Sequence, residues 1–253
     1  MIDSALALEV AQYALLGFFA QLVDGALGMA YGLITSSVLI TLGLSPAAAS
    51  AAVHTAEIAT TGASGLSHLA HRNVDRRLVV PLAISGVAGG VLGAVVLTEL
   101  PLGIVKPLVA AYLLLMGVLI LYKARRRALA FHPTRRVMPL GLAGGFLDAI
   151  GGGGWGPIAS STLLARGHMP RKAIGSVNLA EFFVSTAIAA AFFTAIGMEH
   201  WRIVAGVVLG GVIAAPLAAR VVSRLNPRAI MVAAGILVIV LALRSLASAL
   251  GLL

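Results

Sequence analysis

The chain has 253 residues, of which 60% are hydrophobic and 11% are charged, and its formal net charge is +9. A soluble domain carries about 25% charged residues, so this chain lacks the polar surface that a soluble enzyme needs. Its apolar runs approach the roughly 20 residues that cross a bilayer as a helix. They are continuous rather than alternating, which argues against a transmembrane β-barrel. The composition therefore predicts an all-α polytopic membrane protein.

The basic residues fall in short segments between apolar runs, so topology signals explain the positive charge better than nucleic-acid binding does. The chain contains no cysteine, which excludes disulfides, thiolate catalysis and cysteine-ligated metals. Its first nine residues include Asp3 and Glu9 but no Lys or Arg. A cleaved signal peptide begins with a basic region, so we expect this segment to belong to the mature protein.

A shift of 124 residues brings two stretches of the chain into register without a gap. The paired positions are Gly17 and Gly141, Asp24 and Asp148, Gly28 and Gly152, Tyr31 and Trp155, Gly32 and Gly156, Ser36 and Ser160, Pro46 and Pro170, His54 and Asn178, and Glu57 and Glu181. Two acids and a proline in one register indicate a tandem repeat. We therefore divide the chain into a first transmembrane repeat over 1–122, a basic cytoplasmic linker over 123–136 and a second transmembrane repeat over 137–253.

Each repeat is predicted to contain the same elements in the same order. The first has an interrupted apolar stretch over 5–42, broken near Asp24, and then helices over 46–70, 78–98 and 103–122. The second has an interrupted stretch over 137–165, broken at 148–154, and then helices over 173–197, 202–220 and 229–250. Pro46 and Pro170 stand where helices often begin. Small-xxx-small spacing predicts close helix packing at Gly86/Gly90, Gly89/Gly93 and Gly206/Gly210.

The distribution of Lys and Arg distinguishes two topologies. If each interrupted stretch crosses the membrane once, the basic residues divide 11 to 7 between the two sides; if it enters and returns, they divide 15 to 3. The second division agrees with the positive-inside bias. It places both termini outside and the two repeats in inverted orientations.

Length supports a re-entrant hairpin in the second repeat. A helix over 137–147 spans only about 16 Å, about half of the hydrocarbon core. Residues 5–23 are long enough to cross completely, so a re-entrant and a two-pass hairpin both stay open for the first repeat. The predicted fold is two inverted-topology repeats, each an interrupted helical hairpin plus three transmembrane helices.

Several ionisable residues lie inside apolar segments, where such groups are costly and usually face a cavity or a transport path. They are Asp24, His54, Glu57, Asp148 and Glu181. An apolar site disfavours the charged form of a carboxyl, which allows it to exchange protons. We therefore predict the four acids as candidate proton-coupling residues and favour the two glutamates. The alternatives are structural contacts between helices and, for the two aspartates, capping of the half-helices that follow.

Polar side chains recur at steps of three and four along segment 46–70, so they share one helical face. They are Ser50, His54, Glu57, Thr61, Ser64 and His68. The corresponding helix of the second repeat repeats the pattern with Asn178, Glu181 and Ser185. This stripe predicts a hydrated pathway between the two helices.

Glycine-rich breaks next to the two aspartates form a second group of candidate functional residues. Four consecutive glycines at 151–154 free the backbone, and a half-helix beginning after them directs its positive end at the break. No Lys or Arg lies near the middle of any segment, so an anion would be bound by backbone N–H groups, hydroxyls and amides. The predicted substrate-binding residues are Gly28, Tyr31, Ser36, His54, Gly152, Gly153, Trp155, Ser160 and Asn178.

The second repeat resembles the TauE/SafE sulfite exporter family, whose members carry a glycine-rich segment early in each half, followed by a helix that begins at a proline. The matching residues are Gly144–Ala149, Gly151–Pro157, Pro170–Arg171, Ile174–Asn178 and Glu181–Phe183. The first repeat is a degenerate copy that lacks the glycine run. The resemblance covers nearly the whole chain. It implies transport of sulfite, thiosulfate or small organosulfonates across the bacterial inner (plasma) membrane, driven by protons.

The function expected from these features is secondary active transport of a small anion, with a passive ion channel or pore as the alternative. An intramembrane enzyme would need a nucleophile with a base or a metal cluster, and His54 with Glu57 supplies only two ligands. We therefore predict no catalysis, no cofactor and no metal site. A structural scaffold would leave the repeated acids unexplained. The expected partners are the anion, protons and the lipid bilayer; nucleic acid is not expected, and a homodimer is left open.

Overall fold

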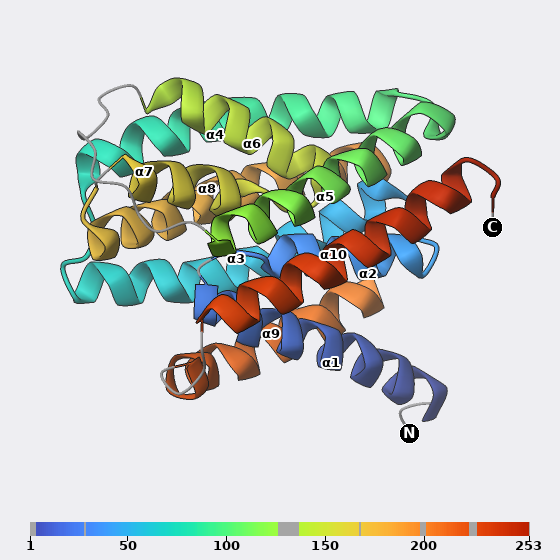
Figure 1. The fold of residues 1–253 in the computed structure, drawn as a ribbon, viewed down its shortest axis with the longest axis horizontal. Helices are drawn as coiled ribbons and strands as arrows, with labels where there is room; N and C mark the ends of the chain where they lie inside the picture. Colours follow the sequence, from blue (N-terminus) through green and yellow to red (C-terminus); the bar gives the residue numbers. More distant parts are fainter. Residues whose placement is uncertain are drawn as a thin grey trace.

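The computed structural model describes residues 4–27, 29–125, 137–166, 168–197, 201–222 and 227–252, and all regular secondary structure in this part of the chain is helical (Figure 1). Most of the predicted linker and the predicted ligand Gly28 lie outside the described residues. The elements are α1 (Ser4–Leu27), α2 (Tyr31–Thr41), α3 (Pro46–Ala70), α4 (Arg76–Glu99), α5 (Leu102–Arg125), α6 (Met138–Gly151), the π-helix η1 (Gly156–Ser160), α7 (Ser161–Ala165), α8 (Pro170–Ile196), α9 (Trp201–Val222) and α10 (Pro227–Ala249).

The six continuous helices predicted from the sequence are confirmed, and local capping explains where several of them begin. Pro46 and Pro170 each stand in the first turn of their helices, α3 and α8. The hydroxyl of Ser45 accepts a hydrogen bond from the N–H of Ala48 at 3.2 Å. The carboxylate of Asp75 accepts one from the N–H of Arg77 at 2.9 Å. These short polar side chains satisfy N–H groups that have no partner inside the helix.

The two interruptions begin later than the sequence suggested. Helix α1 continues past Asp24 to Leu27, and α6 continues past Asp148 to Gly151, so both aspartates lie in the last turn of a helix. The chain leaves the helical conformation only where the backbone takes positive φ values: 62° at Gly152 and 153° at Gly153. Ala30 has φ 130° at the first break. An aspartate can occupy the last turn of a helix, whereas a residue with positive φ cannot continue the helix.

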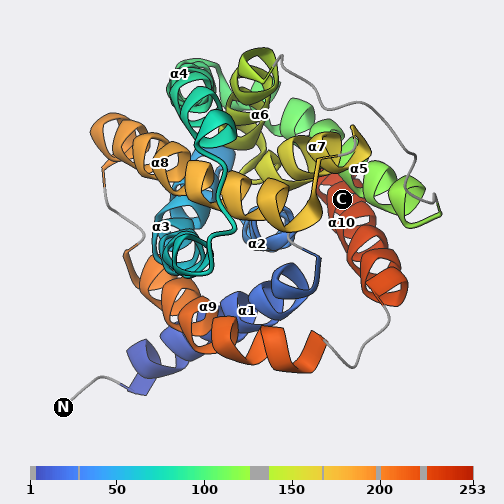
Figure 2. The same ribbon diagram turned by 90° about the vertical axis from the view of Figure 1, so that its left-hand side faces the viewer.

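The helices pack in pairs that follow the symmetry of the repeat: if each helix is replaced by its counterpart in the other repeat, the same set of pairs results. Helix α1 packs on α9 and its counterpart α6 packs on α4, while α3 packs on α8 and α5 on α10. Figure 2 shows the α4–α6 and α1–α9 pairs on opposite sides of the molecule, with α2 between them. Each interrupted element is therefore covered mainly by a helix of the other repeat.

Glycines allow these two pairs to approach closely, as the small-xxx-small spacing predicted. A Cβ at Gly89 or Gly145 of the α4–α6 pair would overlap the backbone of the facing helix. The same holds for Gly17 and Gly210 in the α1–α9 pair. Gly90 instead faces Ile188 of α8. The side-chain-free surface brings backbone atoms into contact, which is how glycine drives packing of transmembrane helices.

Four described helices have the length and apolar character of membrane spans. They are Arg76–Glu99, Leu102–Arg125, Arg171–Ile196 and Met231–Ala249, with shorter apolar helices at Tyr31–Thr41, Met138–Gly151 and Trp201–Ala215. Large apolar side chains such as Leu66, Ile84 and Leu115 are exposed on the outer surface. A surface of this kind suits lipid rather than water, in agreement with a multi-pass membrane protein.

Candidate functional site

A cavity of about 760 Å³ lies beside the two breaks, between α1, α2, α3, α8, α9 and the segment that joins α6 to η1. All four predicted acids line it: Asp24, Glu57, Asp148 and Glu181. Its other polar lining residues are Gln21, Tyr31, Thr60, Thr61, Ser64, Ser67, His68 and Asn178. Among the described residues, neither Lys nor Arg contributes to the wall. The cavity is thus acidic and rich in hydroxyl groups, within an apolar protein.

The two aspartates make the same contact in both repeats. Oδ1 of Asp24 accepts a hydrogen bond from the N–H of Tyr31 at 3.2 Å, at the start of α2. Oδ1 of Asp148 accepts one from the N–H of Trp155 at 2.9 Å, immediately before η1. Each carboxylate therefore reaches across its break and caps the half-helix that follows. This contact accounts for the identical seven-residue spacing between aspartate and aromatic residue.

The two breaks touch each other at the centre of the molecule. A Cβ at Gly153 would overlap the backbone of Gly32 and Leu33 in the first turn of α2. A Cβ at Gly152 would lie 2.8 Å from Cβ of Ser36. Both glycines are buried, and both have positive φ. The open space next to the breaks is therefore the cavity, where Gly32 and Gly153 form part of the wall.

Contacts with three other helices hold the second break in place: two side chains from α5 and α3 reach it, and its own Trp155 reaches α8. The hydroxyl of Tyr112 in α5 donates to the carbonyl of Gly153 at 3.0 Å. The hydroxyl of Ser50 in α3 donates to the carbonyl of Ala149 at 2.6 Å. The indole N–H of Trp155 donates to the carbonyl of Val177 in α8 at 3.2 Å, and its ring is fully buried. The first two contacts satisfy carbonyls of Gly153 and Ala149 at the end of the broken helix, and the third satisfies the buried indole N–H.

The π-helix that follows the second break has its own support. Nζ of Lys123, at the end of α5, donates to the carbonyl of Pro157 at 2.7 Å and to the hydroxyl of Ser161. The hydroxyl of Ser160 is buried and has no hydrogen-bond partner within the described structure. A π-helical turn displaces the normal backbone pairing, and the lysine ammonium binds one of the displaced carbonyls.

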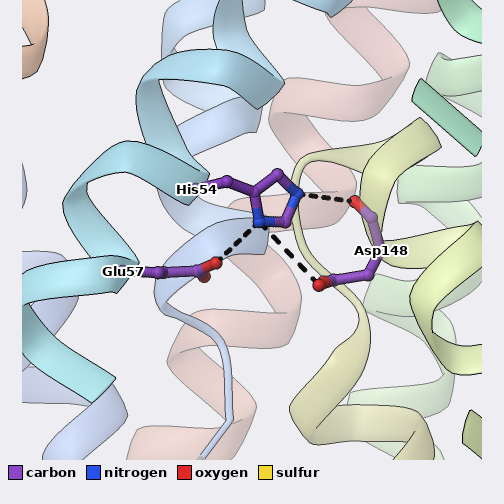
Figure 3. A group of neighbouring side chains, drawn as sticks. All are labelled: His54, Glu57 and Asp148. Atoms are coloured by element: carbon purple, nitrogen blue, oxygen red, sulfur yellow. Dashed lines mark hydrogen bonds and ion pairs between the residues drawn. The ribbon is translucent and has the colours of Figure 1, made fainter. Parts of the chain in front are cut away.

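His54 joins the two repeats through a buried polar cluster (Figure 3). Its Nδ1 lies 2.9 Å from Oε2 of Glu57 and 3.9 Å from Oδ2 of Asp148. Its Nε2 lies 3.3 Å from the backbone carbonyl of Asp148. The hydroxyl of Ser185 in α8 donates to Oε2 of Glu57 at 3.1 Å. The cluster thus links α3, the end of α6 and α8.

The sequence found two possible metal ligands in α3 and no third. The structure places Asp148, from the other repeat, beside them: one ligand atom from each of His54, Glu57 and Asp148 lies within 4.8 Å of the other two. All three side chains are buried. Spacing along one helix could not reveal a ligand 94 residues away.

The predicted substrate-binding residues divide into two groups. Tyr31, Gly153 and Asn178 line the cavity. Ser36, His54, Gly152, Trp155 and Ser160 are buried in the structure around it and do not appear in its described wall. Ser36, for example, directs its hydroxyl to the carbonyl of Leu33 at 3.4 Å. Its contact is therefore with the backbone of its own helix.

Several residues at the site were not predicted, among them Thr60 and Ser67 in α3. Gln21 lines the cavity three residues before Asp24, and this helical spacing would have identified it. Tyr112 contacts the second break from α5, and no sequence pattern connects these two segments. Asn178, the counterpart of His54, donates to the hydroxyl of Ser64 at 2.9 Å and so joins α8 to α3.

Comparisons with known proteins agree with the resemblance noted from the sequence. The family model described as "Sulfite exporter TauE/SafE" matches residues 13–245. The chain is 40% identical over 247 residues to "Probable membrane transporter protein YtnM" of Bacillus subtilis (strain 168), covering 92% of this chain and 81% of that protein. No solved structure matches the chain.

Proposed function

Because the chain belongs to the TauE/SafE sulfite exporter family, we propose that this membrane transporter moves a small anion by proton-coupled secondary transport. The candidate substrates are sulfite, thiosulfate and small organosulfonates, and the membrane is the bacterial inner (plasma) membrane. The observation that carries the proposal is one cavity whose wall includes both breaks and all four acids of the apolar segments. A site at the meeting point of two broken helices is typical of secondary transporters.

The cavity offers an anion neutral donors rather than cationic side chains. The first turn of α2 lines it at Gly32 and Leu33, and the N–H groups at a helix start bind anions. On the same wall, the hydroxyl of Ser64 accepts from Asn178 and retains a proton to donate, whereas the hydroxyls of Tyr31 and Thr60 donate to backbone carbonyls in this structure. A small oxyanion has several acceptor oxygens, so it can accept hydrogen bonds from such donors simultaneously.

The four carboxylates determine the sign of the coupling. Ionised acids would repel an anion in this cavity, since its described wall contains no Lys or Arg. Protonation removes that repulsion and supplies O–H donors. The proton and the anion therefore bind more tightly together than separately, which is the reciprocity that coupled transport requires. Of the four acids, Glu57 and Glu181 are the preferred coupling residues, because both aspartates cap helices.

The proposal includes an inverted-repeat topology with both termini outside and segment 123–136 in the cytoplasm. The exchanged helix pairs support it, as does the position of both termini at the same end of the molecule in Figure 1. The chain has no cysteine, so a single Ala130→Cys substitution can be labelled specifically. Labelling by a membrane-impermeant reagent added outside intact cells would contradict this topology.

Transport in proteoliposomes tests the function directly. We expect protein-dependent flux of at least one of sulfite, thiosulfate and a sulfonate, with accumulation against its gradient when a pH gradient is imposed. Empty liposomes and a protonophore are the controls. Flux that never exceeds equilibrium, whatever the pH gradient, would indicate the passive channel instead. Absence of flux for all three anions would overturn the substrate assignment.

A further inference from the structure

We propose that His54, Glu57 and Asp148 form a binding site for a divalent transition-metal ion that bridges the two repeats. The class of ligand follows from the donor set: one imidazole nitrogen and two carboxylate oxygens suit zinc and its neighbours better than calcium or magnesium. This inference does not depend on which anion the protein transports.

The positions of the donor atoms fit one shared ion. A tetrahedral zinc site with bonds of about 2.0–2.1 Å separates its ligand atoms by about 3.3 Å. The observed distances from Nδ1 of His54, 2.9 Å to Glu57 and 3.9 Å to Asp148, lie on either side of this value. Small rotations of the two carboxylates would therefore complete three ligand positions (Figure 3).

The surrounding hydrogen bonds prepare the donors for a cation. Nε2 of His54 faces the carbonyl of Asp148 at 3.3 Å, and an N–H donated there leaves the lone pair on Nδ1. Such a carbonyl partner is the usual support of a metal-binding histidine. In this tautomer the lone pair faces Oε2 of Glu57 at 2.9 Å, so a cation between the two atoms would bind both acceptors.

Asp148 supplies an independent indication. Its side chain is 1% exposed, yet Oδ2 has no hydrogen-bond partner in the described part of the chain. Buried polar atoms are normally satisfied, and exceptions often mark a bound ion. The described residues place no Lys or Arg in the wall beside these two buried carboxylates, so a bound cation would offset their charge. Because Glu57 and Asp148 line the cavity, an ion can reach the site from it.

A bound ion would join α3 of the first repeat to the end of α6 in the second. A ligand that binds across two elements stabilises the conformation in which they are close. Zinc should therefore hold the transporter in the state described here. Its affinity should fall as pH decreases, because protons compete for the same three ligands.

Zinc binding to the intact protein tests the site. The protein is purified in detergent without a histidine tag, equilibrated with zinc, desalted and analysed for metal, and cobalt absorption reports the coordination. We expect one zinc per chain at neutral pH and a rise in thermal stability. His54→Gln should abolish both, and Glu57→Gln or Asp148→Asn should weaken binding by at least ~10-fold.

The matched controls are His68→Gln and Glu181→Gln, which change an imidazole and a carboxylate of the same cavity outside the cluster. Both should bind zinc as the unmodified protein does. If the unmodified protein retains no zinc, the proposal is wrong, whatever the variants do. Equal retention by the unmodified protein and the His54→Gln variant would also overturn it, and a proton shared between His54 and Glu57 would then be the better account of the geometry.

Discussion

The two breaks of the molecule share one capping contact but differ in what surrounds them. At the first, Asp24 and Tyr31 are part of the cavity wall. At the second, Trp155 is fully buried, and Asp148 contacts both the cavity and the His54 cluster. Tyr112 and Ser50 bind backbone carbonyls of the second break. Both breaks thus contribute to the cavity wall, but core side chains of α3 and α5 bind carbonyls of the second break. At the first break, Tyr31 lines the cavity and its hydroxyl donates to the carbonyl of Val207 in α9.

This difference shows how a duplicated element can take on two tasks. The capping aspartate preserves the local geometry in both repeats, because each broken helix needs its N–H groups satisfied. The remaining residues are free to diverge. Gly152 and Gly153 let the second break pack against α2 without side chains, and Gly151 and Gly154 leave room for the ring of Tyr112. The first break retains Met29 and Tyr31, which line the cavity.

The largest expected difference in stability comes from placing valine at corresponding positions of the two breaks. Gly153→Val forces a β-branched residue into φ 153° and against the backbone of α2. We expect a loss of about 3 kcal/mol or more in stability and loss of substrate binding. Met29→Val, at the corresponding position of the first break, should change stability by only about 0.5 kcal/mol. Thermal unfolding in detergent and substrate binding measure both effects, and an unchanged affinity in Gly153→Val would contradict this account.

A second comparison, between the two glutamates and the two aspartates, distinguishes residues that couple protons to transport from residues that cap helices. Glu57→Gln and Glu181→Gln should reduce pH-gradient-driven accumulation roughly 10-fold or more while substrate exchange continues, because an amide cannot carry the proton. Asp24→Asn and Asp148→Asn serve as the comparison, since each retains an oxygen that can cap its half-helix. Exchange and accumulation are measured in the same proteoliposomes. Full accumulation by all four variants would show that these acids do not couple protons to transport.

The capping contact should contribute more to the stability of the protein at the second break than at the first. Asp148→Ala leaves the N–H of Trp155 without its partner, and we expect it to cost about 2 kcal/mol. Asp24→Ala should cost about 1 kcal/mol, because its site borders the open cavity. Thermal unfolding of the two variants, with the corresponding Asn variants as controls, provides the measurement. Equal losses at the two positions would show that the surroundings do not matter.

The smallest expected effect concerns the support from α5. Tyr112→Phe removes the hydroxyl that donates to Gly153, so the loss of stability should be about 1 kcal/mol. The readout is again the unfolding temperature. A Tyr112→Phe variant as stable as the unmodified protein would mean that water replaces the hydroxyl at this carbonyl.

The sequence predicted the helices well because their determinants are local. Apolar runs, Pro46 and Pro170 mark segments that the structure confirms as α3 and α8. The breaks were predicted too early along the chain, because the prediction placed them at the aspartates. In the second repeat the helix ends instead where φ becomes positive, at Gly152 and Gly153. Repetition of the acids identified Glu57 and Glu181, which the structure places on one cavity.

What the sequence could not predict depends on contacts between distant segments. Trp155 seemed suited to contact substrate, yet its indole donates to Val177 within the core. Asp148 reaches His54 only because α6 ends beside α3. Whether a side chain of a helix faces the cavity or the core depends on which neighbouring helices cover that face. Here the neighbours come from the other repeat, and the sequence of one repeat says little about them.

The glycine contacts of the α1–α9 and α4–α6 pairs limit how the molecule can move. Backbone atoms touch across both seams at Gly17, Gly210, Gly89 and Gly145, so sliding would create overlaps within each pair. Since every pair contains one helix from each repeat, the two sequence repeats are interleaved and cannot rock against each other as separate halves. For the transport cycle proposed above, we therefore expect the mixed pairs to move as rigid bodies, with the breaks at 29–30 and 152–155 as the joints between them and the centre.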